Sequence, residues 1–289
     1  MNMLLEKQKN WLRLALTPGM QFESFYGLLK AFGLPEAIFS QSLSSLMTVL
    51  PQSVALSLRR PPSLQTDEQI ERILHFLSSV PNARLLVPSD EDFPKKFLMV
   101  PQPPLVTLAV GKVALLNKTT VSLVGSSHPS AQGEEIAKSW AGSLVRKNVA
   151  LVEGDGEGIE KTTLKAAIKS NAQSLIIVSK NIATDSNFFE KSLFMSERGL
   201  LLSPIEMQND PWPSRQRLLL AGVEHFVVIE ASARSKVLSL MREAADINRN
   251  ILAVPGSIYS PLSKGTNRLI REGAKLVESV DDILSEIAN

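Results

Sequence analysis

Apolar residues follow two different patterns along the chain, and the change falls near residue 105. Before it they recur at helical spacing, as from Phe22 to Leu29, and Pro-Gly or Leu-Pro pairs separate the segments. This spacing predicts a small bundle of helices over residues 1–65. Residues 66–104 then hold one more helix, from about Asp67 to Ser79, and a proline-rich extended connector.

After residue 105, short apolar runs alternate with amphipathic segments. The runs are Val121–Val124, Val149–Val152, Leu175–Val178, Leu200–Leu202, Phe226–Ile229, Ile251–Val254 and Leu276–Val277. Repeated strand–helix–strand units predict an α/β fold, with a Rossmann-like, doubly wound parallel sheet over residues 105–289. Ligands of such sheets bind beyond the carboxyl ends of the strands.

Composition narrows the class of protein. The 289 residues contain no apolar run long enough to cross a membrane, and the N-terminus MNMLLEKQKNWLR carries charges where a signal peptide needs an apolar core. We therefore expect a cytoplasmic protein without membrane contact. The absence of cysteine excludes thiolate chemistry, and three scattered histidines predict no metal site. The net charge is only +2, so contact with a polyanion requires local clustering of cations.

Three glycine-containing turns follow predicted strands at the carboxyl edge. They are Gly125-Ser126-Ser127, Gly154 to Gly158, and Pro255-Gly256-Ser257. The third leads through Lys264 to the start of a helix, where free N–H groups can bind a phosphate or where the polar residues merely cap the helix. The second turn contains Asp155 and Glu157, whose charges would repel a pyrophosphate, so we expect no nicotinamide or flavin cofactor.

Several segments resemble the DNA-processing protein A family (DprA, also called Smf). The longest is also the most specific, and together the segments run through most of the chain: TPG (17–19), FPKKFL (93–98), PQPPLVTLAVG (101–111), VSLVGSS (121–127), GLLLSP (199–204), WPSRQRLLLAG (212–222), VVIEASARS (227–235) and AVPGSIYSPLSKGTNRLIREGAKLVES (253–279).

The resemblance implies a function as well as a fold. It implies a sterile-alpha-motif-like or helix-hairpin-helix-like N-terminal domain, and a Rossmann-like domain that binds single-stranded DNA without catalysis or a cofactor. It also implies a homodimer that loads a RecA-type recombinase during natural transformation. A winged-helix domain often follows the core in this family, and the sequence shows none before Asn289.

On this resemblance, nine residues are candidates for DNA binding. They supply backbone N–H groups, hydroxyls, an amide and cations: Gly125, Ser126, Ser127, Arg215, Arg217, Gly256, Ser257, Lys264 and Asn267. The two arginines have a structural alternative, since either can pair with Glu230 or Asp155. Trp212 can stack on a base or anchor its loop.

Departures from the family pattern predict weakened binding. Ser127 stands where relatives have an arginine, and the SGxAxGID pattern becomes Glu153 to Glu160, which brings extra carboxylates to the edge. Gln216 replaces an asparagine, and Lys236 replaces a glycine. Each lost phosphate contact lowers the salt slope of single-strand binding by about 0.7.

Two other functions stay open. Related Rossmann-like enzymes hydrolyse nucleotides with a PGGxGTxxE loop, of which this chain keeps Gly265-Thr266 but lacks the glutamate. Glu230 is the other candidate carboxylate, and no paired base accompanies it in the sequence. Alternatively, the binding edge has decayed and the chain acts only through protein contacts.

Overall fold

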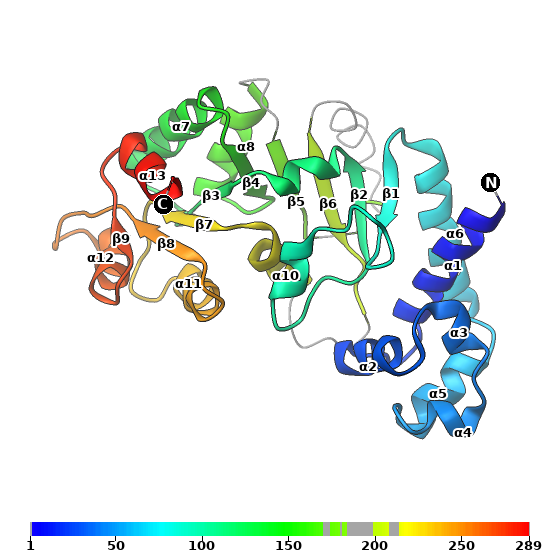
Figure 1. Cartoon of the computed structure of the whole chain (residues 1–289). Helices are drawn as coiled ribbons and strands as arrows, with labels where there is room; N and C mark the ends of the chain where they lie inside the picture. Colours follow the sequence, from blue (N-terminus) through cyan, green and yellow to red (C-terminus); the bar gives the residue numbers. More distant parts are fainter. Residues whose placement is uncertain (1, 170–173, 180, 184–198, 208–213, 289) are drawn as a thin grey trace.

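The computed structural model describes residues 2–169, 174–179, 181–183, 199–207 and 214–288 (Figure 1). The sequence also predicts a helix from Asn187 to Glu197, which lies outside this part of the chain, as does Trp212. The N-terminal part forms helices, as predicted: α1 Asn2–Ala15, α2 Phe22–Phe32, α3 Pro35–Phe39, α4 Leu43–Leu46, α5 Gln52–Arg59 and α6 Leu64–Ser79.

The described strands form one nine-stranded sheet in the order β1-β2-β6-β5-β4-β3-β7-β8-β9. Their bounds are β1 Ala83–Leu86, β2 Thr107–Gly111, β3 Thr120–Val124, β4 Ala150–Gly154, β5 Ser174–Ile177, β6 Leu200–Pro204, β7 His225–Val228, β8 Asn250–Ala253 and β9 Lys275–Leu276.

All pairs from β6 to β9 are parallel, which confirms the predicted α/β class and doubly wound topology. At the other edge, β1 pairs antiparallel with β2, and β2 pairs antiparallel with β6. The alternation rule did not predict this pairing. Antiparallel neighbours need no crossover helix between them, so this part of the sequence lacks the strand–helix–strand signature.

Helices cover both faces of the parallel part (Figure 1). One face packs on α7 Ala131–Arg146, α8 Ile159–Lys169 and α13 Val280–Ile287. The other packs on α10 Ser214–Gly222, α11 Val237–Asp246 and α12 Lys264–Arg271. Neighbouring strand residues alternate between these cores, as Val227 and Val228 do. The alternation explains why each strand reads as a continuous apolar run.

The N-terminal helices share a third core with the antiparallel edge of the sheet. Trp11, Phe25 and Ile70 from α1, α2 and α6 belong to one cluster with Leu108 of β2 and Leu201 of β6. The helices therefore cover the sheet at the end away from β9 (Figure 1). Short 3₁₀ helices, η1 Lys95–Met99 and η2 Val113–Asn117, flank β2.

No helix among the described residues is long and apolar enough to cross a membrane.

Candidate functional site

The carboxyl ends of four adjacent parallel strands form the candidate site. In the sheet β4, β3, β7 and β8 are consecutive neighbours, so the loops that follow them lie along one edge. The sequence predicted that three turns meet here, and the structure brings together the segments 125–130, 154–158 and 254–263 with a fourth, 229–236, that was not predicted.

The loops after β3 and β4 pack closely against each other. Gly158 has a φ of +66°, a left-handed conformation that glycine adopts without steric cost, and this turn brings the next residue to Ser126. Ile159 N–H donates to the Ser126 carbonyl (3.1 Å). Ser127 is exposed, and its hydroxyl lies 3.1 Å from His128 Nδ1. Ser126 is thus held by the fold, whereas Ser127 stays open to solvent.

A carboxylate of the protein itself occupies the N-terminus of α7. Glu230 follows β7 and accepts hydrogen bonds from Ser130 N–H (2.9 Å) and the Ser130 hydroxyl (2.5 Å). A side chain at Gly133 would meet this carboxylate, because an added Cβ lies 2.5 Å from Glu230 Cδ. Similarly, a Cβ at Gly125 would lie 2.9 Å from the Glu230 carbonyl. The anion position of this helix is therefore filled within the fold.

Arg215, near the start of α10, is held by two carboxylates. Its guanidinium forms an ion pair with Glu160, and its Nε lies 3.0 Å from Asp155 Oδ1 without the alignment of a hydrogen bond. Asp155 also accepts from Ser179 N–H (2.8 Å). Gly154 leaves room for the guanidinium, since a Cβ there would overlap it. This pairing is the structural alternative that the sequence offered for Arg215.

Glu153 lies beside this ion pair and is fully buried in β4. Among the described residues neither of its carboxylate oxygens has a hydrogen-bond partner. Burial, reinforced by the nearby charge of Glu160, raises the pKa of Glu153 well above its usual value. The side chain is therefore held in its neutral form over a wider pH range than an exposed glutamate.

Arg217 lies in the interior, at the contact with the N-terminal helices. Its side chain is 4% exposed, and its guanidinium stacks over the Phe22 ring of α2 at 5.4 Å. One of its N–H groups donates to Gln102 Oε1 (2.9 Å). This arginine joins α10 to the N-terminal helices rather than facing the solvent at the edge.

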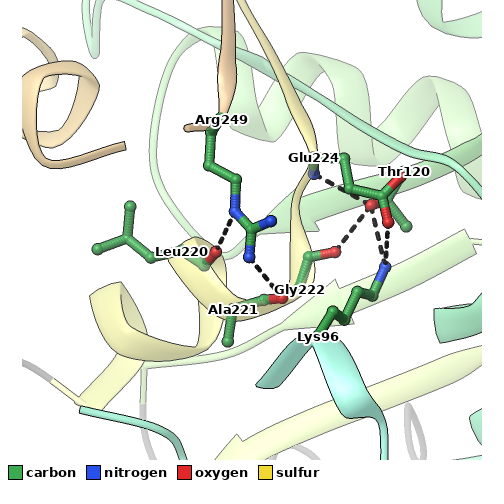
Figure 2. Close-up of polar contacts among 7 residues, drawn as sticks. All are labelled: Lys96, Thr120, Leu220, Ala221, Gly222, Glu224 and Arg249. Carbon is green, nitrogen blue, oxygen red and sulfur yellow. Dashed lines mark hydrogen bonds and ion pairs between the residues drawn. The ribbon is translucent and has the colours of Figure 1, made fainter. Parts of the chain in front are cut away.

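The far end of α10 is fixed by a network of polar residues (Figure 2). Arg249 donates to the carbonyls of Leu220 (3.0 Å) and Ala221 (3.5 Å), which are orphan acceptors at the helix C-terminus. Lys96 Nζ reaches Glu224 Oε1 (3.1 Å) and Thr120 Oγ1 (3.2 Å), although burial lowers the pKa of Lys96. The network anchors the helix that presents Arg215 to the carboxylates.

The loop after β8 is closed by an amide clamp. Asn267 on α12 accepts from Gly256 N–H (3.2 Å) and donates to the Gly256 carbonyl (2.8 Å). A Cβ at Gly256 would overlap the Ser263 hydroxyl. Ser257 is exposed, and Lys264, at the start of α12, is exposed without a hydrogen bond or ion pair to any described residue. The two residues predicted to bind DNA in this loop, Ser257 and Lys264, are therefore both exposed to solvent.

The loop after β7 brings two further cations to the same place. Ala231 N–H donates to the Leu262 carbonyl (2.7 Å), and Gly265 N–H donates to the Ala231 carbonyl (2.7 Å), so this loop is tied to the start of α12. Arg234 and Lys236 are exposed, and neither pairs with a residue in the described part of the chain. In the sequence, Lys236 is distinguished only by the glycine it replaces, and Arg234 is not among the candidate residues.

The edge is thus divided by charge. We call residues 153–160 the acidic half, because they contain Glu153, Asp155, Glu157 and Glu160 and no cation. The basic half comprises residues 231–242 and 254–271, which contain no Asp or Glu. Its cations are Arg234, Lys236, Arg242, Lys264, Arg268 and Arg271. This absence of acids across two segments is the sequence signal that identifies the basic half.

The fold defines a Rossmann-like α/β protein, with the candidate site beyond the carboxyl ends of its parallel strands. The chain belongs to the DNA recombination-mediator protein A family, because the family model matches residues 84–288. This confirms the resemblance read from the sequence and places the chain in a family of DNA-processing and DNA-recombination proteins.

Individual relatives agree with this assignment. The DNA processing protein DprA of Bacillus subtilis is 28% identical over 207 residues, which are 69% of each chain. The X-ray structure of DNA processing protein A from Streptococcus pneumoniae is 21% identical, with a TM-score of 0.77 over 96% of this chain and 97% of that one. The Helicobacter pylori protein, solved for its single-stranded DNA binding mode, is 20% identical, with a TM-score of 0.59 over 72% and 96% of the two chains.

Proposed function

We propose that the chain binds single-stranded DNA through the basic half of its carboxyl edge, as a DNA-processing protein without catalytic activity of its own. The observation that carries the proposal is the set of exposed, unpaired cations Arg234, Lys236 and Lys264, on two loops tied by backbone hydrogen bonds. Cations free of internal partners release counterions when they meet phosphates. The single-strand binding named for the Helicobacter pylori relative supports the same ligand.

The acidic half weakens this binding. Arg215 of α10, which lies against this half, is neutralised by Asp155 and Glu160, and Glu230 fills the anion position at the start of α7. A phosphate at these positions must displace a carboxylate that already holds the donors. We therefore propose fewer backbone contacts than an edge with cations along its whole length, and a correspondingly shallower salt dependence.

Partners follow from the family alone. We propose that the protein forms a homodimer and helps to load a RecA-type recombinase during natural transformation. In this proposal Gly125 and Ser126 shape the loop after β3. Four other residues lie along the bound DNA strand and position its sugar-phosphate backbone: Ser127, Gly256, Ser257 and Asn267.

The nucleotide-hydrolysing alternative finds little support at the site. Glu230, its candidate carboxylate, accepts two hydrogen bonds from Ser130 at the start of α7. Thr266 is buried, and its hydroxyl donates to the Ser263 carbonyl (3.2 Å). Neither group is placed to activate water beside a bound nucleotide.

Titration of fluorescent oligo(dT) tests the proposal. The parent should bind at low salt and lose affinity as salt rises. Lys264→Ala should weaken binding to every sequence and lower the salt slope by about 0.7. The matched control is Lys161→Ala, which removes an exposed cation that pairs with Glu157 (2.9 Å) on the acidic half. Absence of oligo(dT) binding by the parent, or release of base from a nucleoside monophosphate, would contradict the proposal.

A further inference from the structure

The loop between β8 and α12 ends in an exposed apolar tip. Ile258 is 66% exposed and Tyr259 is 89% exposed, so almost the whole phenol ring lies in solvent. In Figure 1 this loop, in orange, projects from the body of the sheet. Two adjacent large side chains held outside the core add little to the stability of the fold, so both are accessible to a ligand.

The tip is built as an ordered turn. Ser257 accepts from Tyr259 N–H through its hydroxyl (3.2 Å) and from Ser260 N–H through its carbonyl (3.0 Å). Below it, Asn267 clamps both backbone groups of Gly256. The ring is therefore presented on a fixed backbone, and little conformational entropy is lost when something binds to it.

The surroundings of the tip select a polyanion. Residues 254–271 contain no Asp or Glu, and Lys264 follows the tip on α12. Lys236 comes from the neighbouring loop, which backbone hydrogen bonds hold against residues 262–265. An exposed aromatic ring on the same edge as unpaired cations matches a strand that alternates phosphates with flat bases.

We propose that the tip of Ile258 and Tyr259 is a stacking platform for one unpaired base of a nucleic-acid strand whose phosphates lie on Lys236 and Lys264. This assignment rests on the proposed function and adds a reason why the protein would prefer single-stranded to duplex DNA. A base in a duplex is already stacked on its neighbours and paired, so its face is not free for the ring. The platform therefore favours single strands, whereas the cations alone bind either form.

The test compares oligo(dT) with an abasic oligonucleotide of equal length and charge. The parent should bind oligo(dT) about tenfold more tightly than the abasic strand. Tyr259→Ala should remove this difference without changing the salt slope, and Tyr259→Phe should keep it. Met99→Ala, at another exposed apolar side chain, is the matched control and should behave as the parent. Because Tyr259 is so exposed, melting temperatures should not change.

Three results would overturn the proposal and are distinguishable. If the parent binds oligo(dT) and the abasic strand equally, and Tyr259→Ala matches it, the cations bind DNA without the platform. If the parent binds neither strand, the proposed function fails together with the platform. If Tyr259→Ala lowers the mass of the free protein in light scattering, the tip is a contact between two copies of the chain.

Discussion

The acidic and basic halves of the carboxyl edge are built from the same strand–loop–helix unit, yet their charges have different partners. Arg215 is shared between Asp155 and Glu160, whereas Lys236 and Lys264 have no partner among the described residues. A cation that is already paired gains little from meeting a phosphate, since it must first lose its carboxylate. The comparison supports the proposal that the partners of the cations, more than their number, decide which half of the edge binds a polyanion.

The same contrast applies to the backbone donors. At the start of α7, Ser130 N–H is bound to Glu230. At the start of α12, the helix carries Lys264 as its first residue, and no carboxylate from the described residues lies on it. One helix N-terminus thus carries a carboxylate, whereas in the other Gly265 N–H is bound only to the Ala231 carbonyl, although both helices follow parallel strands.

The largest expected effect comes from separating the two loops of the basic half. A Cβ at Gly265 would lie 2.6 Å from the Ala231 carbonyl and 2.7 Å from the Ser232 carbonyl. Gly265→Ala should therefore lower the free energy of unfolding by about 1–3 kcal/mol and weaken oligo(dT) binding, because it moves Lys264 away from Lys236. Urea denaturation and oligonucleotide titration of one sample measure both effects.

The control for this variant is Gly222→Ala. A Cβ there meets Ile177 Cδ1 at an ordinary 3.5 Å, so stability and binding should both stay near those of the parent. Equal behaviour of the two variants would show that the loops are not held together at Gly265.

Next to the acidic half, Arg215→Met should lower stability and leave DNA binding unchanged. The substitution leaves Asp155 and Glu160 as neighbouring negative charges without a cation between them. Because the side chain of Arg215 is 23% exposed, solvent screens part of this repulsion, and we expect the free energy of unfolding to fall by about 1–2 kcal/mol. The dissociation constant for oligo(dT) should change by less than about twofold. Weaker binding with a lower salt slope would mean that Arg215 leaves its carboxylates to reach DNA.

Much of this arrangement was predictable from the sequence. The strand pattern gave the parallel sheet and the edge where its loops meet, and Asp155 was already a possible partner of Arg215. The hydrogen bonds between Glu230 and Ser130 at the N-terminus of α7 were not predictable, because the two residues are 100 positions apart and neither lies in a distinctive sequence pattern. Lys236 was interpreted through the glycine it replaces, so its charge was overlooked. A short strand from Arg84 to Val87 is predictable and corresponds to β1, whereas β2 and the antiparallel pairing were missed because a proline-rich stretch hides them.

Adding charge should convert the acidic half into a binding surface. Ser127→Arg with Glu157→Arg adds two cations and removes one anion, at exposed positions of neighbouring loops. We expect tighter oligo(dT) binding at low salt and a slope steeper by up to about 1.4 for two new phosphate contacts. The reversed-charge control, Ser127→Glu, should weaken binding. An unchanged affinity in the double variant would place the strand entirely on the basic half.

The smallest effect concerns pH and Glu153. Burial raises the pKa of Glu153, so its neutral form stabilises the fold at low pH, and this contribution is lost as pH rises through the folded-state pKa. Glu153→Gln keeps the shape without the titration. The free energy of unfolding of the variant, relative to that of the parent, should be higher at pH 8 than at pH 5. Urea denaturation of both proteins at the two pH values measures this difference. A difference that does not grow with pH would mean that Glu153 is solvated or paired.

The central claim is that the basic half holds the DNA backbone, and matched lysine pairs test it most directly. Lys236→Ala with Lys264→Ala removes two exposed cations from the basic half, and Lys161→Ala with Lys165→Ala removes two from α8 beside the acidic half. The net charge changes equally. In oligo(dT) titrations across a salt series, the first pair should lower the slope by about 1.4 and the second should leave it unchanged. Equal losses from the two pairs, or a larger loss from Lys161 and Lys165, would contradict the claim.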